Sequence, residues 1–169
     1  MAGAWWTKIG LLGEKAVNDT ATLPTVEANL FLITGGPILM TSLIGELATV
    51  MSANATECKF QAVPTAGTAT TRDLCTAEDI QGFAADDLIG LTGINTDALL
   101  PTAVRGSSGS IEGMTMPVVL PAGALRLDID APGQTTGSII WTLRYVPLSP
   151  DSRVVSAQLC IFGRPSGRC

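Results

Sequence analysis

The chain contains no histidine, and only 15% of its 169 residues are charged. The missing histidine excludes the serine–histidine–aspartate and cysteine–histidine arrangements of nucleophilic enzymes, and any metal site with imidazole ligands. Charged residues make up about 25% of an average globular protein, so this surface is unusually neutral. A chain with so little charge either buries a large core or has part of its surface covered by other subunits, and we expect the second.

Positive charge is also scarce. The net charge is −5, and the sequence has no basic run and no alternation of basic with aromatic residues. Direct binding of nucleic acid is therefore not expected. Arginine becomes more frequent late in the chain, at Arg144, Arg153, Arg164 and Arg168. These side chains could meet an acidic neighbour, although solvated arginines on a tail are the simpler interpretation.

The four cysteines, Cys58, Cys75, Cys160 and Cys169, include no CxxC pair. Without CxxC spacing and without histidine we expect no zinc, and we expect no other metal or cofactor. Four cysteines allow three pairings, and a Cys58–Cys75 bridge stays open for an extracellular particle. Free thiols fit better, because residues 1–8 lack the charged-then-apolar layout of a secretory signal. The chain is expected to fold in the cytoplasm where it is made.

One uncharged apolar run, residues 30–45, is almost long enough to span a membrane. Gly35-Gly36-Pro37 interrupts it in the middle, where a helix would break. The run therefore predicts two strands joined at that turn, and no membrane span.

The clearest strand pattern lies at residues 124–130 and 137–146. Leu125, Leu127 and Ile129 alternate with polar residues, and the second segment alternates in the same way around Trp141. Period-2 alternation directs one set of side chains to a core and the other to water. Because turn-forming residues lie between the two segments, the pattern predicts an antiparallel hairpin.

The remaining sequence is also divided into short strands by turns. We expect these strands at 29–34, 38–51, 57–63, 87–94 and 116–120, with a short helical turn starting at Thr76. About eight strands in all indicate an all-β fold, a two-sheet sandwich or jelly roll. The body would cover residues 29–148, with an extended N-terminal arm at 1–28 and a C-terminal tail at 149–169.

The arm and the tail contain the candidate assembly contacts. Trp5 and Trp6 would point to opposite sides of an extended segment, so both are hard to bury in one core. They could bind a neighbouring subunit, or one could cap the core while the other lies on the surface. The candidate contact residues are Trp5, Trp6, Arg153, Arg164 and Arg168.

Two acidic residues, Asp128 and Asp130, share one face of a predicted strand. Such a pair could lie near a cation or a sugar. The ordinary interpretation, the solvated face of an amphipathic strand, explains them better. We therefore predict no catalytic residue. The chain is not expected to be an enzyme, and no small-molecule substrate is expected.

Residues 31–38, 43–45 and 137–148 resemble small β-rich structural proteins of tailed bacteriophages, including head decoration (cement) proteins. The resemblance implies a homotrimer on the outer capsid surface of the virion, holding neighbouring major capsid proteins together. It offers no catalytic residue. The alternatives are a tail- or fibre-associated module that binds a host-surface ligand through the loop at 95–113, or a sugar-binding jelly roll that uses Asp128 and Asp130 with calcium.

Overall fold

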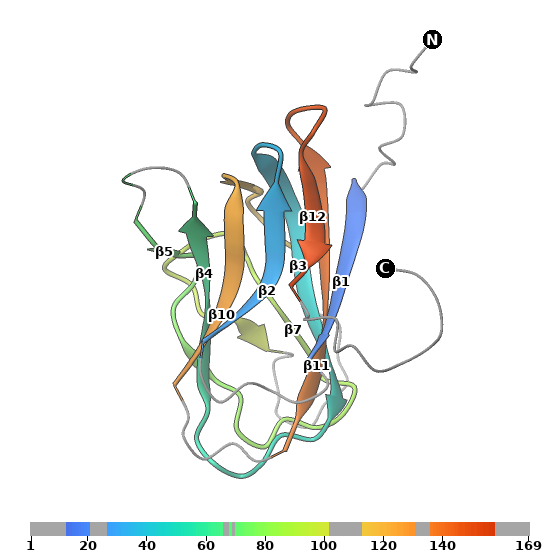
Figure 1. Cartoon of the computed structure of the whole chain (residues 1–169). Helices are drawn as coiled ribbons and strands as arrows, with labels where there is room; N and C mark the ends of the chain where they lie inside the picture. The colour runs from blue at the N-terminus through green and yellow to red at the C-terminus, as the bar shows by residue number, and fades with distance from the viewer. Residues whose placement is uncertain are drawn as a thin grey trace, which may run out of the picture.

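The computed structural model describes residues 13–20, 27–65, 68, 70–101, 113–130 and 136–157, without the side chains of Leu100, Pro101 and Asp130. These residues contain no helix and form twelve strands. The strands make two six-stranded antiparallel sheets that lie face to face (Figure 1). The predicted all-β, two-sheet sandwich is confirmed.

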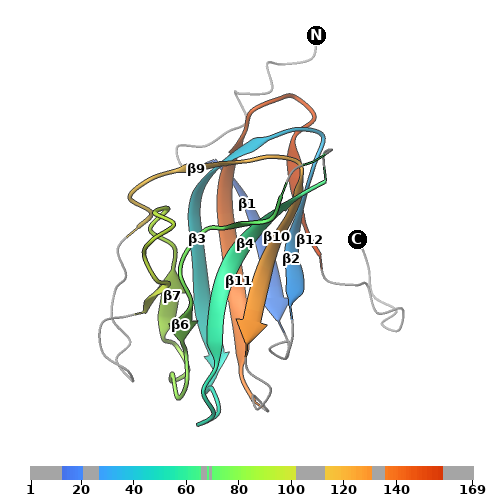
Figure 2. The ribbon, with the colours of Figure 1, turned by 90° about the vertical axis from the view of Figure 1, so that its left-hand side faces the viewer.

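We name the two layers sheet A and sheet B, and the view of Figure 2 separates β3 and β7 of sheet A from β2 and β12 of sheet B. Sheet A has the order β1 (Glu14–Thr20), β11 (Ser138–Pro147), β3 (Ile38–Thr49), β7 (Leu88–Gly90) and β8 (Leu100–Pro101), with β9 (Val118–Leu120) also paired to β3. Sheet B has the order β12 (Arg153–Ser156), β2 (Ala28–Thr34), β10 (Gly123–Asp130), β4 (Glu57–Pro64) and β5 (Arg72–Asp73), with β6 (Glu78–Asp79) also paired to β4.

The two strands of the predicted hairpin exist, but they do not pair with each other. β10 lies in sheet B between β2 and β4, whereas β11 lies in sheet A between β1 and β3. The alternation itself is correct, because Leu125, Leu127 and Ile129 are buried, as is Trp141. Both apolar faces point into the one core between the sheets. The hairpin prediction is wrong because alternation specifies a buried face and not a neighbouring strand.

Trp141 of β11 joins the two sheets at the centre of the core. Its ring meets the ring of Phe60 from β4 edge to face, with the centroids 4.8 Å apart. Gly45 lies opposite Trp141 on β3, and a Cβ atom there would lie 2.6 Å from the indole ring. A glycine at this position therefore makes room for the largest side chain of the core.

Two segments that the sequence assigns to the arm and the tail belong to the sheets. Glu14–Thr20 forms β1, and Arg153–Ser156 forms β12. The Asn18 amide nitrogen of β1 donates to the Leu30 carbonyl of β2 and to the Ser156 hydroxyl of β12 at 2.9 Å. These bonds link sheet A to sheet B along the side of the sandwich where β1 and β12 lie close together (Figure 1).

Two further local predictions are settled by the backbone. Gly35-Gly36-Pro37 joins β2 to β3, so the predicted pair of strands around this turn is confirmed. The helical turn predicted from Thr76 is wrong, because residues 78–79 form β6. The Asp79 carboxylate accepts hydrogen bonds from the backbone N–H groups of Thr56 and Gln81, both at 3.0 Å, and so stabilises this short strand instead of a helix start.

None of the described residues lies in a helix long and apolar enough to cross a membrane.

Candidate functional site

The chemically reactive side chains of the described residues are dispersed or buried. No group of three or more cysteine and acidic side chains among them could hold a metal ion. Cys58 and Cys75 are free thiols in the core. Burial raises the pKa of both thiols, that of Cys75 to about 11. A thiol with a raised pKa is a poor nucleophile at neutral pH, so neither residue suggests an active site.

Most of the predicted assembly contacts lie outside the described residues, namely Trp5, Trp6, Arg164 and Arg168. Arg153 is exposed on β12, and its Nε donates to the Thr34 hydroxyl at 3.2 Å. Thr34 lies on the neighbouring strand β2 of the same sheet. Within the described part of the chain, this arginine therefore makes a local contact and no contact with an acidic group.

The outer face of sheet B carries a network of charges that satisfy one another. The Gln61 amide nitrogen donates to Asp73 at 2.7 Å, and its amide oxygen accepts from Arg126 Nε at 3.1 Å. Arg126 also forms an ion pair with Glu27. Lys59 lies 3.1 Å from Asp73, so each charge in this network has a partner of opposite sign or a hydrogen bond.

The predicted acidic pair on β10 belongs to the edge of this network. A carboxylate oxygen of Asp128 lies 3.6 Å from the Lys59 ammonium group. A bound cation at Asp128 would therefore be repelled by Lys59, and the side chain of Asp130 lies outside the described part. The hydrogen bond from Gln61 and the nearby Lys59 lower the pKa of Asp73, and the bond to Asp73 raises the pKa of Lys59.

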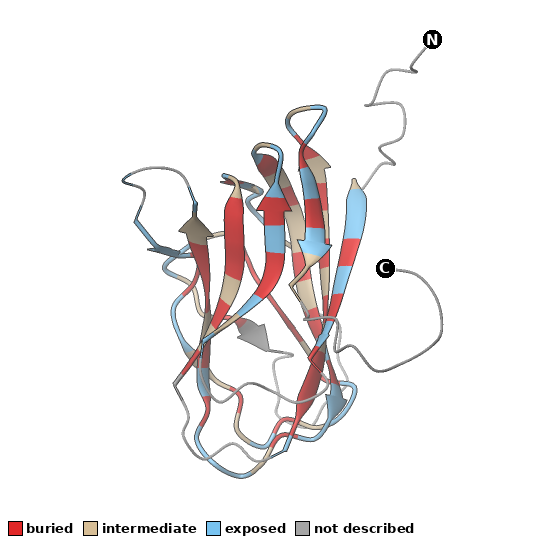
Figure 3. Ribbon diagram, in the orientation of Figure 1, coloured by how far each residue is buried: buried red, intermediate tan, exposed pale blue. Residues whose placement is uncertain are grey.

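The outer face of sheet A is different, because it consists of three cross-strand rows of distinct character on β1, β11 and β3. Following the pairing of these strands, we name the basic row (Lys15, Arg144, Ser42), the neutral row (Val17, Thr142, Ile44) and the acidic row (Asp19, Ile140, Glu46). All nine side chains are exposed or half-buried. Figure 3 shows the alternation along β1, in which Ala16, Asn18 and Thr20 are buried between the exposed residues.

The charged side chains of this face have no partners among the residues that the structure describes. Lys15, Arg144, Asp19 and Glu46 form no ion pair and no side-chain hydrogen bond with any residue that the structure describes. Val17 in the neutral row exposes 42% of its surface. The face therefore presents apolar side chains between two bands of unpaired charge, and a surface of this kind is typical of a protein contact.

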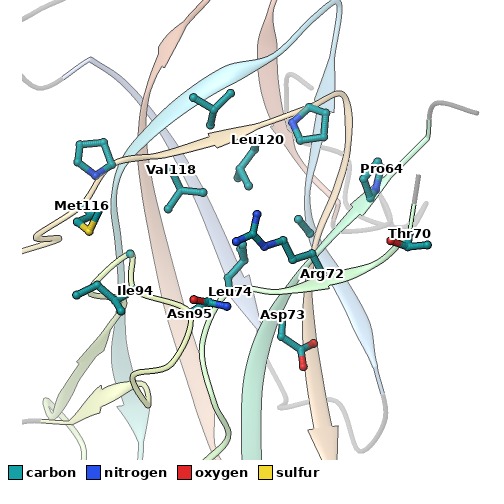
Figure 4. Close-up of a pocket in the computed structure, with 15 residues that line it drawn as sticks. Pro64, Thr70, Arg72, Asp73, Leu74, Ile94, Asn95, Met116, Val118 and Leu120 are labelled. Atoms are coloured by element: carbon teal, nitrogen blue, oxygen red, sulfur yellow. The ribbon is translucent and has the colours of Figure 1, made fainter. Parts of the chain in front are cut away.

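A pocket of about 590 Å³ lies at one end of the sandwich. Its apolar wall includes Ile94, Met116, Val118 and Leu120, and Thr70, Arg72 and Asn95 contribute polar groups. Arg72 extends from β5 into this space (Figure 4). Its guanidinium group has no hydrogen bond to a described residue. The size and lining suit a small amphiphilic ligand.

Comparison with known proteins does not identify a function for these surfaces. No protein-family model, no curated protein sequence and no solved structure matches the chain. The outer face of sheet A was not predicted from the sequence, because residues 14–20, which form β1, were assigned to the arm. The signal that could have found it is the alternation of Lys15, Val17 and Asp19 with Ala16, Asn18 and Thr20.

Proposed function

We propose that this chain is a non-enzymatic structural protein of a tailed-bacteriophage virion, a decoration subunit that stabilises contacts between major capsid proteins on the capsid surface. The observation that carries the assembly role is the outer face of sheet A, with its half-exposed apolar side chains and four charges that have no partner in the described part of the chain. The assignment to a virion is supported by the resemblance of residues 31–38, 43–45 and 137–148 to phage structural proteins.

The composition supports the same role. In a chain with only 15% charged residues, exposed apolar groups favour contacts that remove them from solvent. The face is built on β11 and β3, which are paired over ten residues of β11. It is therefore a rigid surface, and a rigid surface loses little conformational entropy when it binds.

The test is co-sedimentation of the purified protein with expanded capsids that lack decoration. We expect saturable binding to the capsids and no binding to the free major capsid protein. Lys15→Asp, on the outer face of sheet A, should weaken capsid binding, whereas the same change at the half-buried Lys59 on sheet B should not. Protein that stays in the supernatant at every concentration would overturn the proposed function.

A second candidate is a tail- or fibre-associated module that binds a host-surface ligand. The pocket favours it, because the Arg72 guanidinium group, which has no hydrogen bond to a described residue, lies beside an apolar wall. Asn95, which also lines the pocket, belongs to the loop at 95–113. In that case Arg72→Ala should reduce adsorption to host cells and leave co-sedimentation with capsids unchanged. Equal adsorption of the variant and the parent protein would argue against this candidate.

A further inference from the structure

We propose that the outer face of sheet A docks against the same face of a second copy of this chain, related by a two-fold axis along the neutral row. The inference rests on the proposed function only in that it assigns a partner to the same surface. It is carried by the order of the three rows, basic, neutral and acidic, along β1, β11 and β3.

The geometry of a β-sheet makes this face complementary to itself. Successive outward-facing residues of a strand are about 6.8 Å apart, so the basic and acidic rows lie at equal distances on either side of the neutral row. Rotation by a half-turn about the neutral row places β1 over β1 and reverses its direction. Lys15 then faces Asp19 of the second copy, and Asp19 faces Lys15 of the second copy.

The same rotation brings Arg144 close to the acidic row of the second copy. Arg144 lies over Ile140 of the second copy, one strand away from Glu46, and neighbouring strands are about 4.8 Å apart. An arginine side chain can span this separation. Four charges that have no partner among the described residues of one copy thus meet charges of opposite sign in the pair. In a two-fold homodimer each residue of the contact surface takes part twice, once from each copy.

The pairing of β1 with β11 within one copy gives a second reason to expect a partner on this face. Lys15 and Arg144 lie directly opposite each other on adjacent strands. Like charges at opposite positions destabilise a sheet, and on sheet A no described carboxylate compensates them. An acidic row from a second copy would supply this compensation, while Val17 and Ile44 would be removed from water at the centre.

The area of the face sets the strength of the contact. The three rows extend over the three strands β1, β11 and β3, and β7 adds Leu88 beside Glu46 and Gly90 beside Ile44. At the spacings above, three rows on three strands cover roughly 300 Å² on each copy, an area typical of a weak and transient contact. The pair should therefore be weak and concentration-dependent, and it should weaken further as salt screens the charged rows.

The experiment is sedimentation equilibrium of the full chain and of three variants, Lys15→Asp, Asp19→Lys and the double swap Lys15→Asp/Asp19→Lys. Each single change places like charges face to face, so the association constant should fall by about tenfold or more. The double swap restores opposite charges across the axis and should return the constant to within about threefold of the parent value. Circular dichroism of all four proteins checks that these exposed changes leave the fold intact.

The outcomes separate this inference from the proposed function. Recovery in the double swap supports the two-fold contact, whether or not the protein binds capsids. Single variants that associate as well as the parent protein would overturn it, as would a double swap no better than the single changes. A homotrimer unaffected by all three variants would overturn the two-fold contact, and saturable binding of the parent protein to capsids would still leave the proposed function standing.

Discussion

The outer faces of the two sheets differ in whether their charged side chains are paired within the chain. On sheet B, Lys59, Asp73 and Arg126 bind one another or Gln61, so the charges are neutralised within the chain. On sheet A, Lys15 and Asp19 lie along one strand with Val17 between them, and neither has a partner among the described residues. The contrast shows that a chain with few charges can satisfy one face internally and leave the other to be satisfied from outside.

The two faces also differ in what separates the charges. On sheet B the amide of Gln61 connects Arg126 to Asp73, so polar groups lie between the charged ones. On sheet A the space between the charged rows is filled by Val17, Thr142 and Ile44. Apolar surface flanked by charge gains from being covered, because burial of apolar area and pairing of charges then occur together.

The largest effect is expected from a change in the core that both faces share. Trp141→Ala would remove the ring that contacts Phe60 from the opposite sheet and leave a cavity, at a cost of about 3–5 kcal/mol in the free energy of unfolding. Urea denaturation would measure this loss. Hydrogen exchange should show protection falling together in β4 and β11; a loss confined to one sheet would mean that the two faces belong to separately folding layers.

A smaller effect is expected at the junction between the sheets. The Tyr145 hydroxyl of sheet A donates to Glu14 at 2.7 Å and accepts from the backbone N–H of Val154 in sheet B at 3.2 Å. Tyr145→Phe removes both bonds and should destabilise the fold by about 1–2 kcal/mol, measured by urea denaturation. An unchanged stability would show that β12 is held by other contacts.

The same residue predicts how stability depends on alkaline pH. Burial, aided by the hydrogen bond to Glu14, raises the pKa of Tyr145 to about 12 from its ordinary value of about 10. Because the folded state favours the neutral phenol, its contribution to stability is complete below pH 10 and is lost as the pH rises through 12. Tyr145 is the only tyrosine of the chain, so the absorbance of tyrosinate reports it alone. Titration near pH 10 would contradict the buried environment.

The smallest effect is expected on the free energy of unfolding under acid conditions, where the outer faces of the two sheets should respond differently. The hydrogen bond from Gln61 and the nearby Lys59 lower the pKa of Asp73, so its contribution is present above its ordinary pKa and is lost as the pH falls through the lowered value. Asp73→Asn should cost less than about 1 kcal/mol at pH 7, because the ion pair is exposed, and the difference should vanish at low pH. Asp19→Asn on sheet A is the matched control and should leave the stability of the monomer unchanged.

The sequence predicted the strands whose buried face is purely apolar, such as β4 and β10. It missed β1, because two of the inward side chains of this strand are polar. Asn18 is buried against the Leu30 carbonyl, and the Thr20 hydroxyl donates to the Ile139 carbonyl at 2.8 Å. A local sequence pattern does not show these hydrogen-bond partners. Without them, the alternation of β1 resembles that of a polar, solvent-exposed segment.

The pairing of the strands could not be predicted from the sequence for a related reason. Alternation around Leu127 and Trp141 predicts which side chains are buried, but either strand could pair with several neighbours. The choice is made by long-range contacts such as that between Trp141 and Gly45, which are 96 positions apart (141 − 45). The rows of the outer face of sheet A depend on the same register, so this surface could not be assembled from the sequence alone.

The most direct test of the contrast between the faces is a pair of matched charge reversals, Lys15→Asp on sheet A and Lys59→Asp on sheet B. Sedimentation equilibrium would measure association, and urea denaturation below the concentration of association would measure stability. We expect Lys15→Asp to weaken association by about tenfold or more without lowering monomer stability, because the new carboxylate would lie opposite Arg144. Lys59→Asp should lower stability and leave association unchanged. Association that responds to Lys59→Asp and not to Lys15→Asp would contradict the assignment of the two faces.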